Sequence, residues 1–361
     1  MWYLDFMWMR AFLVAALFLA QISNAEFGRL TSLLSEPEGY FDTDNFISNE
    51  AGYLKILPLF DSMRIKGGVY LGVGPDQNYS YIAAIKPELA VLVDVRRQNQ
   101  LQHFLYKALS FLSADRNEFL ERLFGKRLSR RGDLSLTDLL DQIESAQRDE
   151  KLIRATVQEV RQYLGGFPLR LNSADFEIIE YIERAFFDAG PRLKFSSFRR
   201  NPNPQYPTYR ELLLETDTAG APGNYLATEE RFQAIRQLHR ENRIIPVVGD
   251  LSGTVALAQI ARELRARNLR VSCFYVSNVE FYLFDTPRWD RYIRNMSALP
   301  WTDNAVIVRS VSNNWRSHPA RLPGYYMTTV LQRCASFLLN ENSGRNATYW
   351  DVVTADYIAP K

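Results

Sequence analysis

The chain has 361 residues, 47% of them hydrophobic, and its 43 basic and 41 acidic side chains nearly balance. This length allows one large α/β domain or two smaller ones, and the balanced charge removes the bulk electrostatic argument for a nucleic-acid partner. The two cysteines, Cys273 and Cys334, are too few for a disulfide framework. A single bridge between them is the alternative to two buried thiols, and the apolar strand expected around Cys273 favours thiols.

The first 25 residues have the order of a secretion signal. Arg10 precedes an apolar run over residues 11–20, and a small-x-small pattern ends at Ala25, so we expect cleavage near Ala25 and export to the periplasm. The run is too short to span a bilayer comfortably, and we expect no membrane span after it. An uncleaved N-terminal anchor that includes residues 1–9 is the alternative. Independently of this, the true start is Met1, Met7 or Met9, and Met9 followed by Arg10 best matches the start of a conventional signal.

Residues 67–99 predict a strand, a glycine turn, a short helix and a second strand. The first strand ends in the letters G-V-G-P, after which we expect Asp76 to cap a helix that Pro87 stops. Residues 89–95 are almost continuously apolar, as in a strand buried on both faces of a parallel sheet. Its one acid, Asp94, lies near the C-terminal end of that strand.

The glycine turn and the acid after it form a candidate nucleoside site. Gly72 and Gly74 let a ligand approach the backbone closely, and the following helix start, with Asp76 and Asn78, points free N–H groups at it. Asp94 comes about 20 residues after the last glycine, where an acid can accept hydrogen bonds from ribose hydroxyls. Glutamine occupies the third glycine position of the dinucleotide fingerprint, so that fingerprint is incomplete. The alternative is a tight turn followed by a solvated strand end.

The middle of the chain is mainly helical. Residues 101–112 predict an amphipathic helix, and residues 115–161 a charged helical insertion. Two basic doublets in the insertion, at 126–127 and 130–131, are interpreted as solvated surface. Another helix is expected over residues 176–187.

The strand–turn–helix–strand order then recurs. Residues 243–248 predict a strand, 249–253 a glycine turn, 254–267 a helix and 270–276 a second strand. Parallel strands need such crossovers, so the two units predict a doubly wound, mostly parallel Rossmann-like α/β sheet. We expect it to form one domain over residues 26–361 that carries the helical insertion.

Polar residues follow the strands of this second unit. Ligands of doubly wound sheets bind outside the C-terminal ends of the strands, so Asp250, Asn278 and Glu280 are expected to join the glycine turn and Asp94. Asp250 and Glu280 are the candidates for a catalytic acid. No Cys/His cluster has the spacing of a zinc site, and we expect no metal, although converging carboxylates leave an oxygen-ligated cation as an alternative.

Five stretches carry a resemblance to a known family. They read G-V-Y-L-G-V-G-P-D-Q-N-Y, V-D-V-R-R-Q-N, Y-L-A-T-E-E-R-F, V-V-G-D-L-S-G and F-Y-V-S-N-V-E-F-Y-L-F. Together, over about residues 45–310, they resemble a family of uncharacterised bacterial proteins that looks like the class I S-adenosylmethionine (SAM)-dependent methyltransferase fold.

The resemblance implies SAM as the cofactor. By the methyltransferase pattern, Gly72 and Gly74 would lie under the methionine part of SAM. Asp94 would lie at its ribose, and Asp250 would face the substrate. The chain departs from the pattern directly after Gly74, where a Pro-Asp pair stands in place of the usual small residue.

Two functions follow from these observations. The first is a SAM-dependent methyltransferase-like protein of unknown substrate, whose partner is a small nucleoside-like ligand. The second is an exported, non-catalytic binding or interaction protein that reuses the fold, because an exported protein would meet almost no SAM. The sequence gives no indication of oligomeric state.

Overall fold

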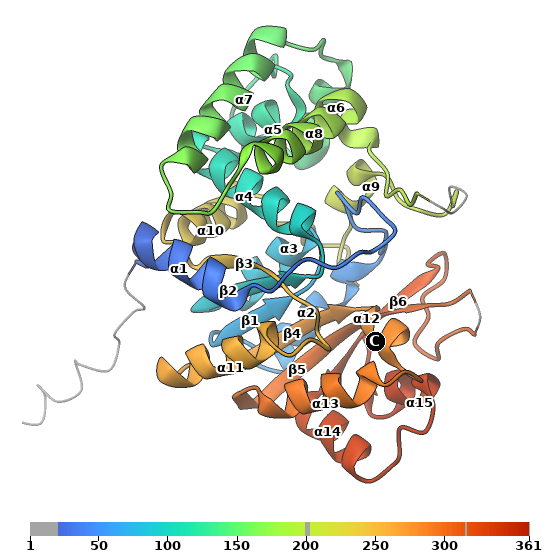
Figure 1. Ribbon diagram of the computed structural model, residues 1–361. Coiled ribbons are helices and arrows are strands. Elements are labelled where there is room, and N and C mark those ends of the chain that lie inside the picture. The colour runs from blue at the N-terminus through green and yellow to red at the C-terminus, as the bar shows by residue number, and fades with distance from the viewer. Residues whose placement is uncertain (1–20, 199–202, 315, 361) are drawn as a thin grey trace, which may run out of the picture.

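The structure is a computed structural model that describes residues 21–198, 203–314 and 316–360 (Figure 1). The apolar run of the expected secretion signal lies outside these residues. Among the residues described, no helix combines the length and the apolar character that crossing a bilayer requires.

A seven-stranded sheet forms the centre of the described chain, in the order β3-β2-β1-β4-β5-β6-β7. β1 to β5 run parallel, whereas β6 is antiparallel to both of its neighbours. The strands are β1 (Val69–Gly72), β2 (Leu89–Asp94), β3 (Ile244–Val248), β4 (Val271–Ser277), β5 (Trp301–Ser312), β6 (Met327–Arg333) and β7 (Tyr357–Ile358). The predicted mostly parallel α/β sheet is confirmed.

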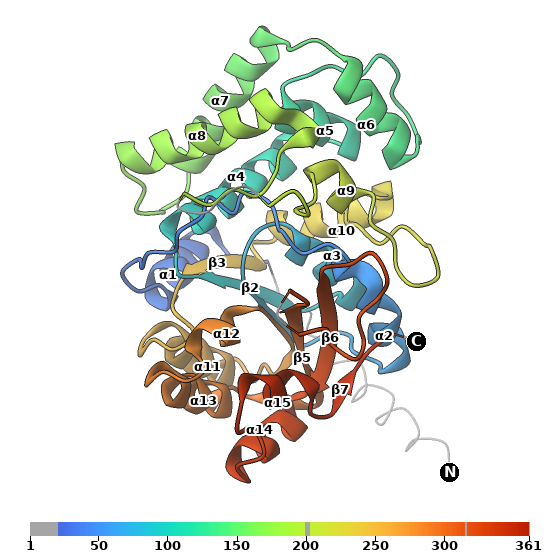
Figure 2. The same cartoon turned by 90° about the vertical axis from the view of Figure 1, so that its right-hand side faces the viewer.

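Helices cover both faces of the sheet (Figures 1 and 2). On one face, α10 packs against α3 and α4; on the other, α11 packs against α1 and α13. Their bounds are α1 (Asn24–Leu34), α3 (Gln77–Ile85), α4 (Arg97–Leu112), α10 (Glu229–Arg240), α11 (Ala256–Ala266) and α13 (Arg288–Ala298). β1, β2 and β3 are buried along almost their whole length, which explains why their sequences are continuously apolar.

A further helical layer lies outside α4, at the top of Figure 1. It consists of α5 (Arg116–Phe124), α6 (Leu136–Ser145), α7 (Glu150–Gly165) and α8 (Ser173–Ala189). The helical region therefore continues beyond residue 161, the end expected for the insertion.

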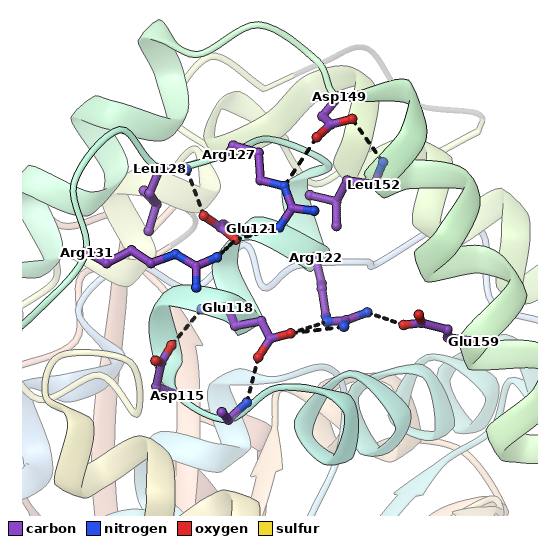
Figure 3. Close-up of polar contacts among 11 residues, drawn as sticks. Asp115, Glu118, Glu121, Arg122, Arg127, Leu128, Arg131, Asp149, Leu152 and Glu159 are labelled. Atoms are coloured by element: carbon purple, nitrogen blue, oxygen red, sulfur yellow. Dashed lines mark hydrogen bonds and ion pairs between the residues drawn. The ribbon is translucent and has the colours of Figure 1, made fainter.

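One arginine of each basic doublet in this layer pairs with the same buried acid (Figure 3). The Glu121 side chain is 1% exposed, and its carboxylate pairs with Arg127 and Arg131, which are 54% and 50% exposed. Its other oxygen accepts a hydrogen bond of 2.9 Å from the Leu128 N–H. Arg127 and Arg131 therefore hold the segment after α5 in place, with their outer atoms in solvent.

The start of α1 is part of the fold. The Ser23 hydroxyl accepts a hydrogen bond of 3.1 Å from the Glu26 N–H and so caps the helix. Ile22 is 5% exposed, and its carbonyl accepts a hydrogen bond of 2.6 Å from the Asn242 side chain. Cleavage after Ala25 would remove this cap and these contacts from α1.

Shorter elements complete the described chain. They are η1 (Tyr53–Ile56), α2 (Leu57–Ser62), η2 (Gly190–Arg192), α9 (Tyr209–Leu213), α12 (Val279–Leu283), α14 (Cys334–Asn342) and α15 (Tyr349–Thr354). Cys273 and Cys334 are buried free thiols, as favoured from the sequence, and burial raises the pKa of both.

Candidate functional site

A cavity of about 180 Å³ opens where β1 to β4 end. Within the sheet, β2 and β3 lie on one side of β1, and β4 lies on its other side. The chain therefore reverses the direction in which it adds strands between β3 and β4. Such a reversal is the topological switch point at which doubly wound sheets bind ligands. On the same measure of volume, a cavity that holds one water needs about 10–15 Å³, so this cavity has room for a small organic molecule.

Four of the predicted site residues line this cavity: Gly74, Asp94, Asp250 and Asn278. Gly72 pairs in register with Leu92 of β2 and Tyr275 of β4, so the strand ends beyond it meet at one edge. Gly74 has φ of +81°, a conformation that favours glycine. The structure thus brings the glycine turn and three strand-end polar residues to one place.

Gly72 and Asn78 lie behind the turn rather than in the cavity lining. The Asn78 side-chain N–H₂ donates to the carbonyls of Val73, Gly74 and Pro75 at 2.9, 3.2 and 2.7 Å. Its oxygen accepts a hydrogen bond of 2.7 Å from a tyrosine hydroxyl of β1. Asn78 is fully buried, and both of its polar atoms are hydrogen-bonded inside the protein, so it fixes the shape of the turn rather than contacting a ligand.

The prediction that Asp76 caps the helix was wrong. Asp76 already has helical backbone angles, and its side chain makes no capping hydrogen bond. Its carboxylate instead accepts hydrogen bonds from the hydroxyls of Tyr209 and Tyr225, at 2.5 and 3.1 Å. Burial raises the pKa of Asp76 to about 6, although both tyrosine hydroxyls act to lower it. Asp76 therefore belongs to a buried polar network beneath the site.

Asp94 lines the cavity and forms a bidentate ion pair with Arg96. Arg96 donates from Nε to Asp94 Oδ1 at 3.0 Å and from Nη2 to Oδ2 at 2.9 Å. Arg96 is 5% exposed and also donates hydrogen bonds to the carbonyls of Thr43 and Asp44. Oδ1 also accepts the Arg96 N–H, which leaves Oδ2 with one lone pair for a ligand hydroxyl.

Asp250 is also paired with an arginine. Arg288 Nη2 lies 2.6 Å from Asp250 Oδ2, and the Ser252 hydroxyl donates to Oδ1 at 2.7 Å. Burial raises the pKa of Asp250, but the hydrogen bonds from Ser252 and the pair with Arg288 outweigh it, so the net shift is downward. This carboxylate stays ionised at neutral pH and is suited to orienting a ligand rather than to accepting a proton.

The structure does not bring Glu280 to the cavity. Glu280 is 1% exposed and pairs with Arg309, whose side chain is equally buried. Tyr292 donates a further hydrogen bond of 2.7 Å to the same carboxylate. Every oxygen of this candidate catalytic acid is therefore engaged inside the protein.

Sequence reasoning missed part of the cavity lining. Glu50 comes from the irregular segment before η1, and Gln77 from the first turn of α3. Glu50 neither follows a strand nor belongs to a periodic pattern, so no signal in the sequence could have found it. Gln77 occupies the third position of the glycine motif after β1, which is the signal that could have found it. Aromatic side chains also contribute to the lining: Tyr40, Phe41, Phe195, Tyr206 and Tyr282.

His103 lies beneath the turn and serves it structurally. Its Nδ1 is 2.7 Å from the Tyr79 hydroxyl, and its Nε2 is 3.0 Å from the Gly74 carbonyl. Burial lowers the pKa of His103 to about 4, so the ring is neutral. Within the described residues, no group of three or more His, Cys, Asp or Glu side chains could hold a metal ion.

Similarity to known proteins shows the family of the chain. A comparison with curated proteins gives no match. A family described as "Domain of unknown function (DUF7790)" matches residues 46–354, which include β1 to β6 and most of the cavity lining. Because this match covers most of the chain, the protein belongs to the DUF7790 family.

Proposed function

We propose that the cavity binds a nucleoside-like ligand, with SAM as the first candidate, and that the protein is a methyltransferase-like protein of unknown substrate. One observation carries this proposal: Gly74, Asp94, Asp250 and Asn278 converge on a cavity at the switch point of a doubly wound sheet. Tight glycine turns and a strand-end acid at such a point are typical of nucleoside sites.

The residues in the lining fit the parts of this ligand. In the proposal, the remaining lone pair of Asp94 Oδ2 accepts from a ribose hydroxyl, and Asn278 offers both a donor and acceptors. The aromatic side chains supply apolar area for a base. On methyl transfer, a substrate lone pair would bond the methyl carbon while the carbon–sulfur electrons return to sulfur, which leaves S-adenosylhomocysteine.

Titration calorimetry with SAM and with S-adenosylhomocysteine tests the proposal. We expect both to bind the wild-type protein, and Asn278→Ala to weaken binding by about tenfold, because one hydrogen bond in a buried site is lost. The exposed Asn314, which is not among the cavity-lining residues, provides the control Asn314→Ala with unchanged affinity. Absence of both heat and thermal shift with either ligand, in folded protein, would remove the proposal.

An exported binding protein without catalysis is the second candidate. The pairing of Asp94 with Arg96 and of Asp250 with Arg288 favours it, since neither acid is free to act as a base. For this candidate we expect ligand binding without transfer of a labelled methyl group. N-terminal sequencing of the mature chain after cell fractionation distinguishes export with cleavage from retention.

A further inference from the structure

We propose that the ligand of this cavity carries a cationic nitrogen and that Glu50 binds it. The inference rests on the proposed binding role of the cavity, and it goes further by naming the charge of the ligand and the residue that selects it. Three observations support it: the charges of the lining, the surroundings of Glu50 and an unused acceptor beside it.

The charges of the lining leave one acid without a counter-ion. Five charged side chains line the cavity, and two ion pairs join four of them, Asp94 with Arg96 and Asp250 with Arg288. Glu50 is the fifth, and no ion pair within the described ranges includes it. When ionised, Glu50 therefore gives the lining a net negative charge.

Neutral groups surround Glu50. Its two carboxylate oxygens accept hydrogen bonds from the Tyr275 and Ser277 hydroxyls. The titratable groups around it are tyrosines of β1, α3, β4, α15 and the segment before β6: Tyr70, Tyr81, Tyr275, Tyr326 and Tyr349. The Ser310 side chain of β5 also faces this carboxylate. A carboxylate offers about four lone-pair sites, so one remains for a ligand beside these three hydroxyls.

Gln77 adds an unused acceptor to the same lining. Its side-chain nitrogen donates to the Tyr275 hydroxyl at 3.2 Å, and the same hydroxyl donates to Glu50, so Gln77 and Glu50 are neighbours through Tyr275. Gln77 is 6% exposed, and its Oε1 has no hydrogen-bond partner in the described structure. An ammonium group has three donors and no acceptor, so it would satisfy both Gln77 Oε1 and Glu50. An anion there would face the same acceptors and be repelled.

The charge state of Glu50 makes the proposal sensitive to pH. Burial raises the pKa of Glu50, although the hydroxyls of Ser277, Tyr275 and Ser310 act to lower it. In the empty cavity the carboxyl therefore holds its proton to a higher pH than usual, and a bound cation must release that proton. Affinity for a cation is expected to rise with pH through the raised pKa and to level off above it. The surrounding tyrosines have raised pKa values and stay neutral in this range.

Matched pairs of probes test the inference. 5′-Amino-5′-deoxyadenosine and adenosine form a nucleoside pair that differs only in an ammonium group against a hydroxyl, while phenethylamine and 2-phenylethanol form a second pair without a nucleoside. We expect the wild-type protein to prefer the amine of each pair by about tenfold or more. Glu50→Gln keeps an acceptor for one of the two hydroxyls and can donate to the oxygen of the other. It should abolish the preference without changing affinity for the neutral probes, whereas Glu50→Asp should retain part of it.

The outcomes separate this inference from the proposed function. If neither nucleoside binds but phenethylamine still binds in preference through Glu50, the proposed function fails and the inference stands. If both nucleosides bind equally well and the amine has no advantage, the inference fails and the proposed function stands. If Glu50→Gln does not fold, calorimetry of the wild type with phenethylamine in two buffers of different ionisation enthalpy measures the protons released on binding. Below the raised pKa of Glu50, we expect binding of the amine to release a proton. Binding of the amine without proton release there would contradict the inference.

Discussion

Glu280→Ala is expected to lower the free energy of unfolding by about 3–5 kcal/mol, because it leaves the charge of Arg309 buried without a partner. Both side chains are 1% exposed, and Arg309 Nη2 donates to Glu280 Oε1 at 3.0 Å while Nε bonds the other oxygen. Arg309 also donates to Gln332 Oε1 at 2.6 Å, so the guanidinium cannot turn towards solvent without breaking that contact. Urea unfolding followed by circular dichroism measures the loss.

An exposed ion pair provides the control for this experiment. Asp61 and Lys66 are 74% and 63% exposed and lie 3.0 Å apart, so Asp61→Ala should cost less than about 1 kcal/mol. Replacing Glu280 and Arg309 together by leucine and methionine should restore much of the lost stability, since both buried charges then disappear. A loss below 1 kcal/mol for Glu280→Ala would show that this pair is not buried as described.

Asn78→Ala is the second change for which we expect a large effect, about 3 kcal/mol or more. It would remove the donor to three carbonyls of the glycine turn and leave the Tyr70 hydroxyl buried without an acceptor. Each unsatisfied buried polar group costs about 1–3 kcal/mol. Since the turn between Gly72 and α3 contributes to the cavity wall, ligand affinity should fall together with stability.

A double variant separates the two parts of the Asn78 effect. Tyr70→Phe in the Asn78→Ala background removes the orphaned hydroxyl and should recover about 1 kcal/mol or more, but it should not restore ligand binding. Asn314→Ala, at an exposed position, should change neither property. If Asn78→Ala unfolds like the wild type, Asn78 does not hold the turn.

The sheet and the cavity edge could be predicted from the sequence because both follow from simple rules. Continuous apolar runs marked β1 to β4, and the rule that ligands bind beyond strand C-termini selected Gly74, Asp94, Asp250 and Asn278. Each lies directly at or after a strand end, so its position depends little on side-chain packing.

Whether the remaining residues reach the site depends on the direction in which their side chains point, and the sequence pattern does not give that direction. Glu280 follows Asn278 by two residues, but α12 begins between them, and two steps of a helix rotate a side chain by about 200°. Glu280 therefore points into the protein while Asn278 lines the cavity. Arg96 has an extended backbone conformation, and its side chain folds back onto Asp94. Glu50 lies in the irregular segment before η1, 225 residues from Tyr275, to which it is hydrogen-bonded.

Hydrogen exchange with and without S-adenosylhomocysteine tests the central claim most directly, because it locates the bound ligand on the chain. We expect added protection in the segments that follow β1, β2, β3 and β4, at residues 73–77, 94–96, 249–251 and 277–279. The outer helices α6 and α7 should not change. Protection confined to other segments, or none at saturating ligand, would contradict a nucleoside site at the switch point.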